Sequence, residues 1–75
     1  MDIKAQEKAL FRDKLAAMDD HDLEEACDSY IFLSAFANNN PRSDFHWQCD
    51  MTYDECKRRN KIEIYTRAHK SFTKG

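Results

Sequence analysis

The feature that most constrains this chain is Leu23 to Ala37, LEEACDSYIFLSAFA, where more apolar surface is concentrated in one run than anywhere else. At about 100° per residue, this run predicts a helix with apolar side chains on nearly every side. A helix of that kind is normally buried on nearly every side. We therefore expect it to form the centre of the fold, wrapped by its sequence neighbours, a second copy or a partner.

The length of 75 residues indicates a single helical domain, residues 1–75, near the lower size at which a core alone holds a fold. Homodimer formation is one remedy for so small a core. No apolar run is long enough to cross a membrane, and the N-terminus lacks the pattern of a secretory signal. We expect a cytoplasmic protein that has no membrane partner.

The three cysteines cannot all pair within one chain, and Cys27 lies inside the apolar run. This pattern favours reduced thiols, as in a cytosolic protein. A disulfide between Cys49 and Cys56 is the less favoured alternative.

The first helix is expected over residues 3–18, where the apolar residues recur at the spacing of one helical face. Asp2 is placed to cap its first turn, and Asp19 is placed to cap the next helix. Met18 and Leu23 bracket Asp19 at the spacing of a hydrophobic staple. We expect an antiparallel hairpin of these two helices, joined at about residue 19. In the first helix, the residues expected to face the core are Ile3, Leu10, Phe11, Leu15 and Met18.

The second helix is expected to end in Asn38 to Pro41. Asparagine tolerates the left-handed C-cap conformation, and a proline disfavours helix at the residue before it. The following residues, 45–51, are ambiguous. Their apolar side chains alternate as in a strand, whereas Ser43 could equally cap a helical turn.

Thr52 to Glu55 has the spacing of a capping box and predicts that a third helix begins there and continues almost to the end of the chain. The alternative interpretation breaks this helix at Asn60 and Lys61 and makes residues 62–66 a strand paired with 45–51. The sequence thus predicts a mainly α fold. We expect a small three-helix domain, a helical hairpin plus a third helix, with a short strand or turn at 45–51 still open.

Signatures of catalysis are weak. The only glycine is Gly75, so no glycine-rich loop can hold a phosphate, and the carboxylates lie in solvated clusters that would not raise a pKa. His46, Cys49 and Cys56 supply three soft ligands, whereas a structural zinc normally needs four. We expect a protein that is not an enzyme and has no cofactor and no metal. His46 is expected at the surface, with the two cysteines as small apolar core residues.

Charge is divided unevenly along the chain. Residues 1–56 carry a net charge of −8 and residues 57–75 carry +6, which together give −2. Such asymmetry indicates either pairing between the two parts or two surfaces with different partners.

The acidic cluster and the nearby aromatic residues form the favoured candidate surface, because acidic clusters steer basic partners and exposed aromatics anchor interfaces. We expect residues 38–51 to fold back so that Phe45 and Trp47 cover Phe32 and Phe36. If they do not, the exposed rings indicate a dimer or a tight binder. The candidate partner-binding residues are Asp19, Asp20, Asp22, Glu24, Glu25, Phe32, Phe36, Phe45 and Trp47.

The basic C-terminal part supports an alternative, a nucleic-acid-binding regulator. An overall isoelectric point near 5.8 makes a nucleic-acid partner less favoured than a protein partner. Without a nucleic-acid partner, the same residues would form a solvated basic face that pairs with residues 19–25. The candidate nucleic-acid-binding residues are Lys57, Arg58, Arg59, Lys61, Arg67 and Lys70.

The favoured function is therefore a non-enzymatic protein-binding module, a small acidic regulator or inhibitor that occupies a partner's surface. Small size, charge segregation and the lack of catalytic motifs would suit a phage or mobile-element protein directed at a host protein, such as one that handles nucleic acids. That comparison is one of style only.

Overall fold

Four helices make up the computed structural model, which describes residues 3–74, without the side chain of Lys74. They are α1 (Ile3–Ala16), α2 (Asp20–Phe36), α3 (Asp44–Arg58) and α4 (Ile62–Lys74). The predicted all-helical class is confirmed, and no strand occurs within residues 3–74. The prediction of three helices is wrong. The proposed cap at Asp2 lies outside the described residues.

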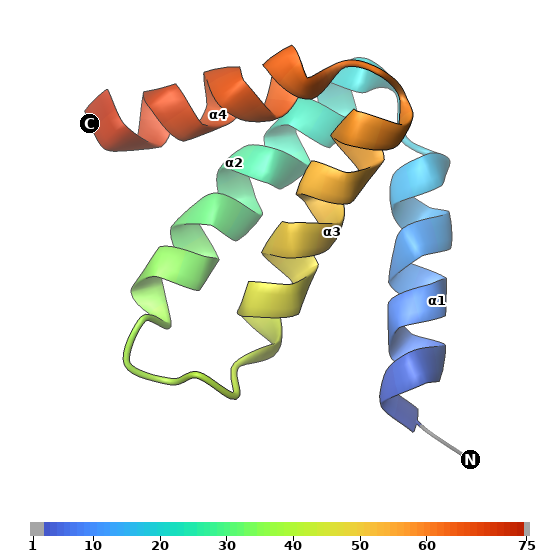
Figure 1. Ribbon diagram of the computed structural model, residues 1–75, viewed down its shortest axis with the longest axis vertical. Helices are drawn as coiled ribbons and strands as arrows, with labels where there is room; N and C mark the ends of the chain where they lie inside the picture. Colours follow the sequence, from blue (N-terminus) through green and yellow to red (C-terminus); the bar gives the residue numbers. More distant parts are fainter. Residues whose placement is uncertain (1–2, 75) are drawn as a thin grey trace.

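The arrangement of the helices differs from the predicted hairpin. Figure 1 shows α2 and α3 as antiparallel neighbours, with α1 on the far side of α3 and α4 crossing beside α2. The main packing partner of α1 is α3, and the main partners of α2 are α3 and α4. The helical hairpin is thus formed by α2 and α3, so the predicted hairpin of the first two helices is wrong.

Contacts from distant parts of the chain explain this placement of α1. The local turn is as predicted, because Asp19 caps α2 and its Oδ1 accepts the Asp22 N–H at 2.8 Å. The position of α1, however, depends on α3. Trp47 packs edge-to-face on Phe11, with ring centroids 5.7 Å apart. Arg59 donates to the carbonyl oxygens of Leu15, in the last turn of α1, and of Met18, just after it. A cap fixes where a helix begins but not which helix its neighbour packs against.

The connection after α2 is built around His46 rather than around a left-handed asparagine. Asn60 is the one non-glycine residue with a positive φ in the described part of the chain, so the predicted left-handed cap at residues 38–40 is wrong. With its proton on Nε2, His46 donates to the carbonyl oxygens of Ala37 and Asn40 at 3.1 and 2.9 Å, while its Nδ1 accepts from Ser34 at 2.8 Å. The expectation of a surface His46 is therefore wrong, because the half-buried ring holds the connection to α2.

Residues 45–51 are helical, so the strand interpretation is wrong. Ser43 caps α3 and accepts the Phe45 N–H at 3.2 Å, as the alternative interpretation proposed. Thr52 lies buried in the middle of α3 and donates to the Cys49 carbonyl at 2.7 Å, so the predicted capping box is also wrong. The apolar alternation at 45–51 was misleading because the buried stripe of α3 follows the spacing of Cys49, Thr52 and Cys56.

The break between α3 and α4 falls at Asn60, as the second interpretation of this region proposed, but residues 62–66 begin a helix rather than a strand. Asn60 has φ 59°, and two hydrogen bonds complete a Schellman cap. Lys61 N–H donates to Cys56 O at 2.9 Å, and Asn60 N–H donates to Lys57 O at 3.0 Å. This cap turns the chain so that α4 can cross α2.

Asn60→Ala is expected to lower the free energy of unfolding by about 1 kcal/mol, because a Cβ without a polar side chain is disfavoured in the left-handed region. Asn60→Gly, the matched control, is expected to keep or raise the stability. Urea denaturation of the two variants measures the difference. Equal stability of the alanine and glycine variants would show that the cap does not need this conformation.

The core gathers residues from all four helices, and α2 contributes one stripe to it, Leu23, Cys27 and Ile31. The expectation that this helix is buried on nearly every side is wrong. Ile3 and Leu10, expected to face the core, are each 70% exposed because α1 meets α3 along its Phe11 and Leu15 side. The buried hydrophobic residues are Phe11, Leu15, Leu23, Cys27, Ile31, Cys49, Cys56, Ile64 and Ala68.

All three cysteines are free thiols, as the favoured interpretation expected. The sulfur atoms of Cys27 and Cys56 lie 3.6 Å apart in the core between α2 and α3. Burial raises the pKa of the Cys27 thiol to about 12. Each of the described helices is too short or too polar to cross a membrane.

Candidate protein-binding surface

The side of α2 opposite its buried stripe carries acidic residues in its first half and aromatic residues in its second half. Asp22, Glu25, Phe32 and Phe36 are spaced so that they share this side of the helix. Phe32 is 56% exposed and Phe36 is 79% exposed. We call the side defined by these four residues the outer face of α2.

The aromatic half of this face includes a residue that the sequence analysis did not select. The Phe32 ring lies 6.4 Å from the Phe36 ring and 6.4 Å from the ring of Phe72 in α4. Phe72 is itself 39% exposed. The three rings therefore form one exposed aromatic cluster. Residue spacing within one helix could not reveal Phe72, since it reaches Phe32 only because α4 crosses α2.

Phe45 and Trp47 lie elsewhere, so the expectation that they cover Phe32 and Phe36 is wrong. Phe45 is half-buried in the first turn of α3. Trp47 packs on Phe11, and its Nε1–H donates to Asp44 at 2.9 Å. The Trp47 ring also makes a cation–π contact with Lys8, whose Nζ lies 5.7 Å from the ring centroid. Trp47 therefore belongs to the contact between α1 and α3.

The acidic residues differ in how much of their charge is paired internally. Asp20 pairs with Arg59 at 3.0 Å and also with Lys61, and these two cations hold the pKa of its carboxyl below the ordinary value. Asp19 serves as the cap of α2. This part of the acidic cluster supports the fold.

Glu24 pairs with Arg67 at 2.7 Å, and that guanidinium lowers the pKa of Glu24. Glu25 pairs with His21 at 3.2 Å on the exposed surface. Within residues 3–74, Asp22 and Asp28 have no ion pair. Partial burial raises the pKa of Asp28, and the neighbouring Glu24 and Glu25 raise it further. Asp22, which has no ion pair, and Glu25, whose one partner is an exposed histidine, keep the outer face acidic.

Most of the candidate basic residues are paired with carboxylates. Glu55, whose side chain is only 3% exposed, accepts from Arg58 at 3.0 Å and from Arg59 at 2.6 Å. Arg58 holds the pKa of Glu55 low, against the effect of burial. Lys57 and Lys70 are exposed and have no ion pair among the described residues. The structure thus brings the basic region onto the acidic cluster, as the internal-pairing interpretation proposed.

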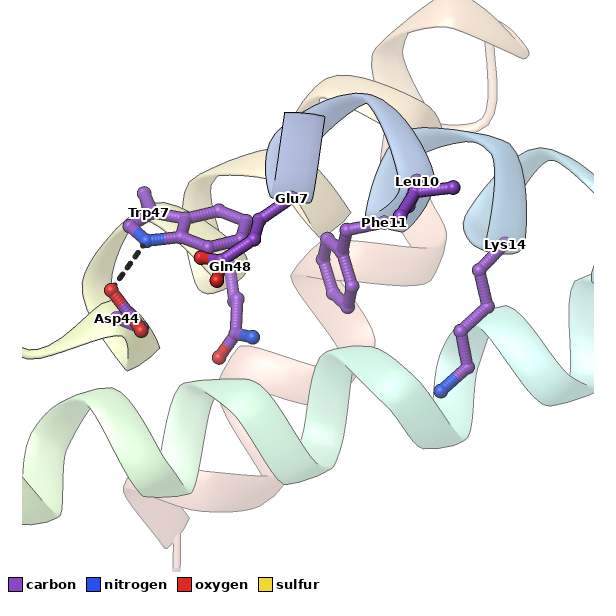
Figure 2. A pocket seen from close by; sticks show the side chains of 7 residues that line it. All are labelled: Glu7, Leu10, Phe11, Lys14, Asp44, Trp47 and Gln48. Carbon is purple, nitrogen blue, oxygen red and sulfur yellow. Dashed lines mark hydrogen bonds between the residues drawn. The ribbon is translucent and has the colours of Figure 1, made fainter. Parts of the chain in front are cut away.

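Two neighbouring hollows open on the surface, the first lined by residues of α1 and α3 and the second by residues of α2 together with Met18. The first has a volume of about 400 Å³, and Figure 2 shows Leu10, Phe11, Lys14 and Trp47 around it. Its remaining lining residues are Glu7, Asp44 and Gln48.

The second hollow, of about 380 Å³, runs along α2. The two hollows meet where Phe11 and Tyr30 touch edge-to-face, with ring centroids 5.2 Å apart. The lining residues of the second hollow are Met18, Asp22, Glu25, Ala26, Ser29, Tyr30 and Leu33.

No group of three or more histidine, cysteine, aspartate or glutamate side chains in the described part of the chain is placed to hold a metal ion. The Nε2 atom of His46 is hydrogen-bonded to carbonyl oxygens of the connection after α2, and the cysteines lie in the core.

Comparisons with protein-family models, with curated proteins and with solved structures find no match to this chain.

Proposed function

We propose that this protein is a non-enzymatic protein-binding module, a small regulator or inhibitor that occupies a partner's surface with the outer face of α2. The observation that carries the proposal is the exposure of Phe32 and Phe36 beside Phe72. A small domain gains stability by burying such rings, and contiguous exposed aromatics are typical of interaction sites. In interfaces, rings of this kind supply much of the binding energy.

The acidic half of the outer face indicates the charge of the partner. Asp22 has no internal ion pair in the described chain, and Glu25 pairs only with the exposed His21. Acidic groups of this kind attract a basic surface and orient it before contact. A partner with a basic surface next to an apolar patch fits best, and a protein that handles nucleic acids has such a surface.

Capture from a nuclease-treated lysate of the native host, followed by affinity measurements on the purified partner, tests the proposal. Phe32→Ser with Phe36→Ser should weaken binding of that partner by roughly tenfold or more, since exposed aromatic anchors commonly contribute 1–2 kcal/mol or more. Lys57→Ser, on the far end of α3, is the matched surface control and should bind like the wild type. Equal binding by all three proteins would refute the role of this face.

The alternative function is nucleic-acid binding through the basic region. It is less favoured because most of the basic residues in this region already have carboxylate partners, namely Arg58, Arg59, Lys61 and Arg67. A salt series separates the two functions. Affinity for DNA or RNA that falls log-linearly with salt, and falls less steeply after Lys57→Ala with Lys70→Ala, would favour nucleic-acid binding.

A further inference from the structure

We infer that two copies of this chain associate side by side through the surface that bears the two hollows, with α1 of each copy lying antiparallel on α2 of the other. This contact shares Asp22 with the outer face of α2 but does not use the aromatic half of that face. It uses the side of α2 that lines the second hollow, whereas Phe32 and Phe36 line neither hollow.

The first half of the contact is an exposed stripe on α1. Ile3, Glu7, Leu10 and Lys14 recur at helical spacing on the side of α1 that does not carry Phe11 and Leu15. Ile3 and Leu10 are large apolar side chains that are each 70% exposed. Leu10 and Lys14 border the first hollow, as Figure 2 shows. The stripe is therefore apolar toward the start of α1 and basic toward its end.

The second half is a stripe on α2 with the opposite order. Asp22 lies at the start of the second hollow and Leu33 at its end, with Ala26 and Ser29 between them. No basic residue lines this hollow. The stripe is acidic toward the start of α2 and apolar toward its end, so it complements α1 when the two helices run antiparallel.

The spacing of the two stripes matches residue by residue. Lys14 and Ile3 are separated by the same number of residues as Asp22 and Leu33, a length of about 16 Å on an α-helix. With Lys14 over Asp22, the intermediate positions place Leu10 over Ala26. Glu7 then lies over Ser29, whose hydroxyl can donate to the carboxylate. Each position of the antiparallel register thus pairs apolar with apolar or charge with a suitable partner.

The symmetry of the chain allows both halves to form at once. Within one copy α1 and α2 run in opposite directions (Figure 1), and the Phe11 to Tyr30 contact places their hollows on the same side. A twofold axis parallel to the two helices exchanges the copies without shifting any residue along the axis. It therefore places α1 of each copy on α2 of the other. The contact is isologous and closes as a dimer rather than growing into a filament.

Sedimentation equilibrium of the purified chain across a wide concentration range tests this inference. We expect a reversible dimer. Lys14→Glu and Asp22→Lys should each weaken association by roughly tenfold or more, because each places like charges opposite one another. The double variant should restore the association, which loss of folding could not explain. Circular dichroism checks that each variant keeps its helices.

Phe36→Ser separates this inference from the proposed function, since it should leave the dimer unchanged while weakening the partner. A chain that stays monomeric at the highest concentration overturns the inference. So does a dimer that survives Leu10→Glu, or a charge swap that fails to restore association in a folded chain.

Discussion

Arg59→Ala is expected to lower the free energy of unfolding by about 3–5 kcal/mol, the range for breaking a buried ion pair, because the buried Glu55 would keep only Arg58 as a partner. The guanidinium donates to Glu55 in the core and to Asp20 at the start of α2. It also donates to the carbonyl oxygens of Leu15 and Met18, at 2.9 and 2.7 Å, where α1 ends. One side chain thus connects three helices. A domain of this size has little stability to spare, so urea or thermal unfolding should show a large shift or no folded state.

Lys57→Ala is the matched control for Arg59, since it removes an exposed cation from the same last turn of α3. Its effect should stay within about 0.5 kcal/mol. Arg59→Lys should recover only part of the stability, because an ammonium cannot reproduce the planar set of five donors. Equal stability of the alanine variants at 57 and 59 would mean that α1 is held by its apolar contacts alone.

Leu23→Ala is expected to cost about 2–5 kcal/mol, since the side chain is fully buried and its truncation leaves a cavity between the helices. Leu33→Ala, on the same helix but half-buried beside the second hollow, is the matched control and should cost clearly less. Denaturation at a protein concentration low enough to keep the chain monomeric measures both. Similar costs at the two positions would show that α2 is buried around more of its surface than the structure has it.

Some features that depend on neighbouring residues could be predicted from the sequence, although the capping box at Thr52 and the left-handed cap at residues 38–40 were wrong. Asp19 and Ser43 are caps because their side chains meet a backbone N–H two or three residues later. The break at Asn60 belongs to the same class, since it depends on the left-handed conformation of one residue. It stayed an alternative because the apolar pattern continues across it, and a pattern cannot show that the helix changes direction there.

Features that depend on distant contacts could not be predicted. Trp47 and Arg59 determine that α1 meets α3, and they lie more than thirty residues beyond α1 in sequence. The same limit applies to the surface. The sequence pattern was enough to select Phe32, Phe36 and the acidic start of α2. It could not show that Asp20 and Glu24 are paired or that Phe72 contacts Phe32, because these contacts depend on where α3 and α4 lie.

The central claim is that α2 is buried along one stripe and leaves a face of acidic and aromatic residues open. Hydroxyl-radical footprinting of the isolated monomer, measured residue by residue by mass spectrometry, tests this most directly. Phe36 and Phe11 have the same intrinsic reactivity, so their oxidation rates compare exposure alone. With exposed fractions of 79% and 8%, Phe36 should be oxidised far faster than Phe11. Comparable slow oxidation of both rings would contradict the account, because it would mean that the outer face of α2 is covered.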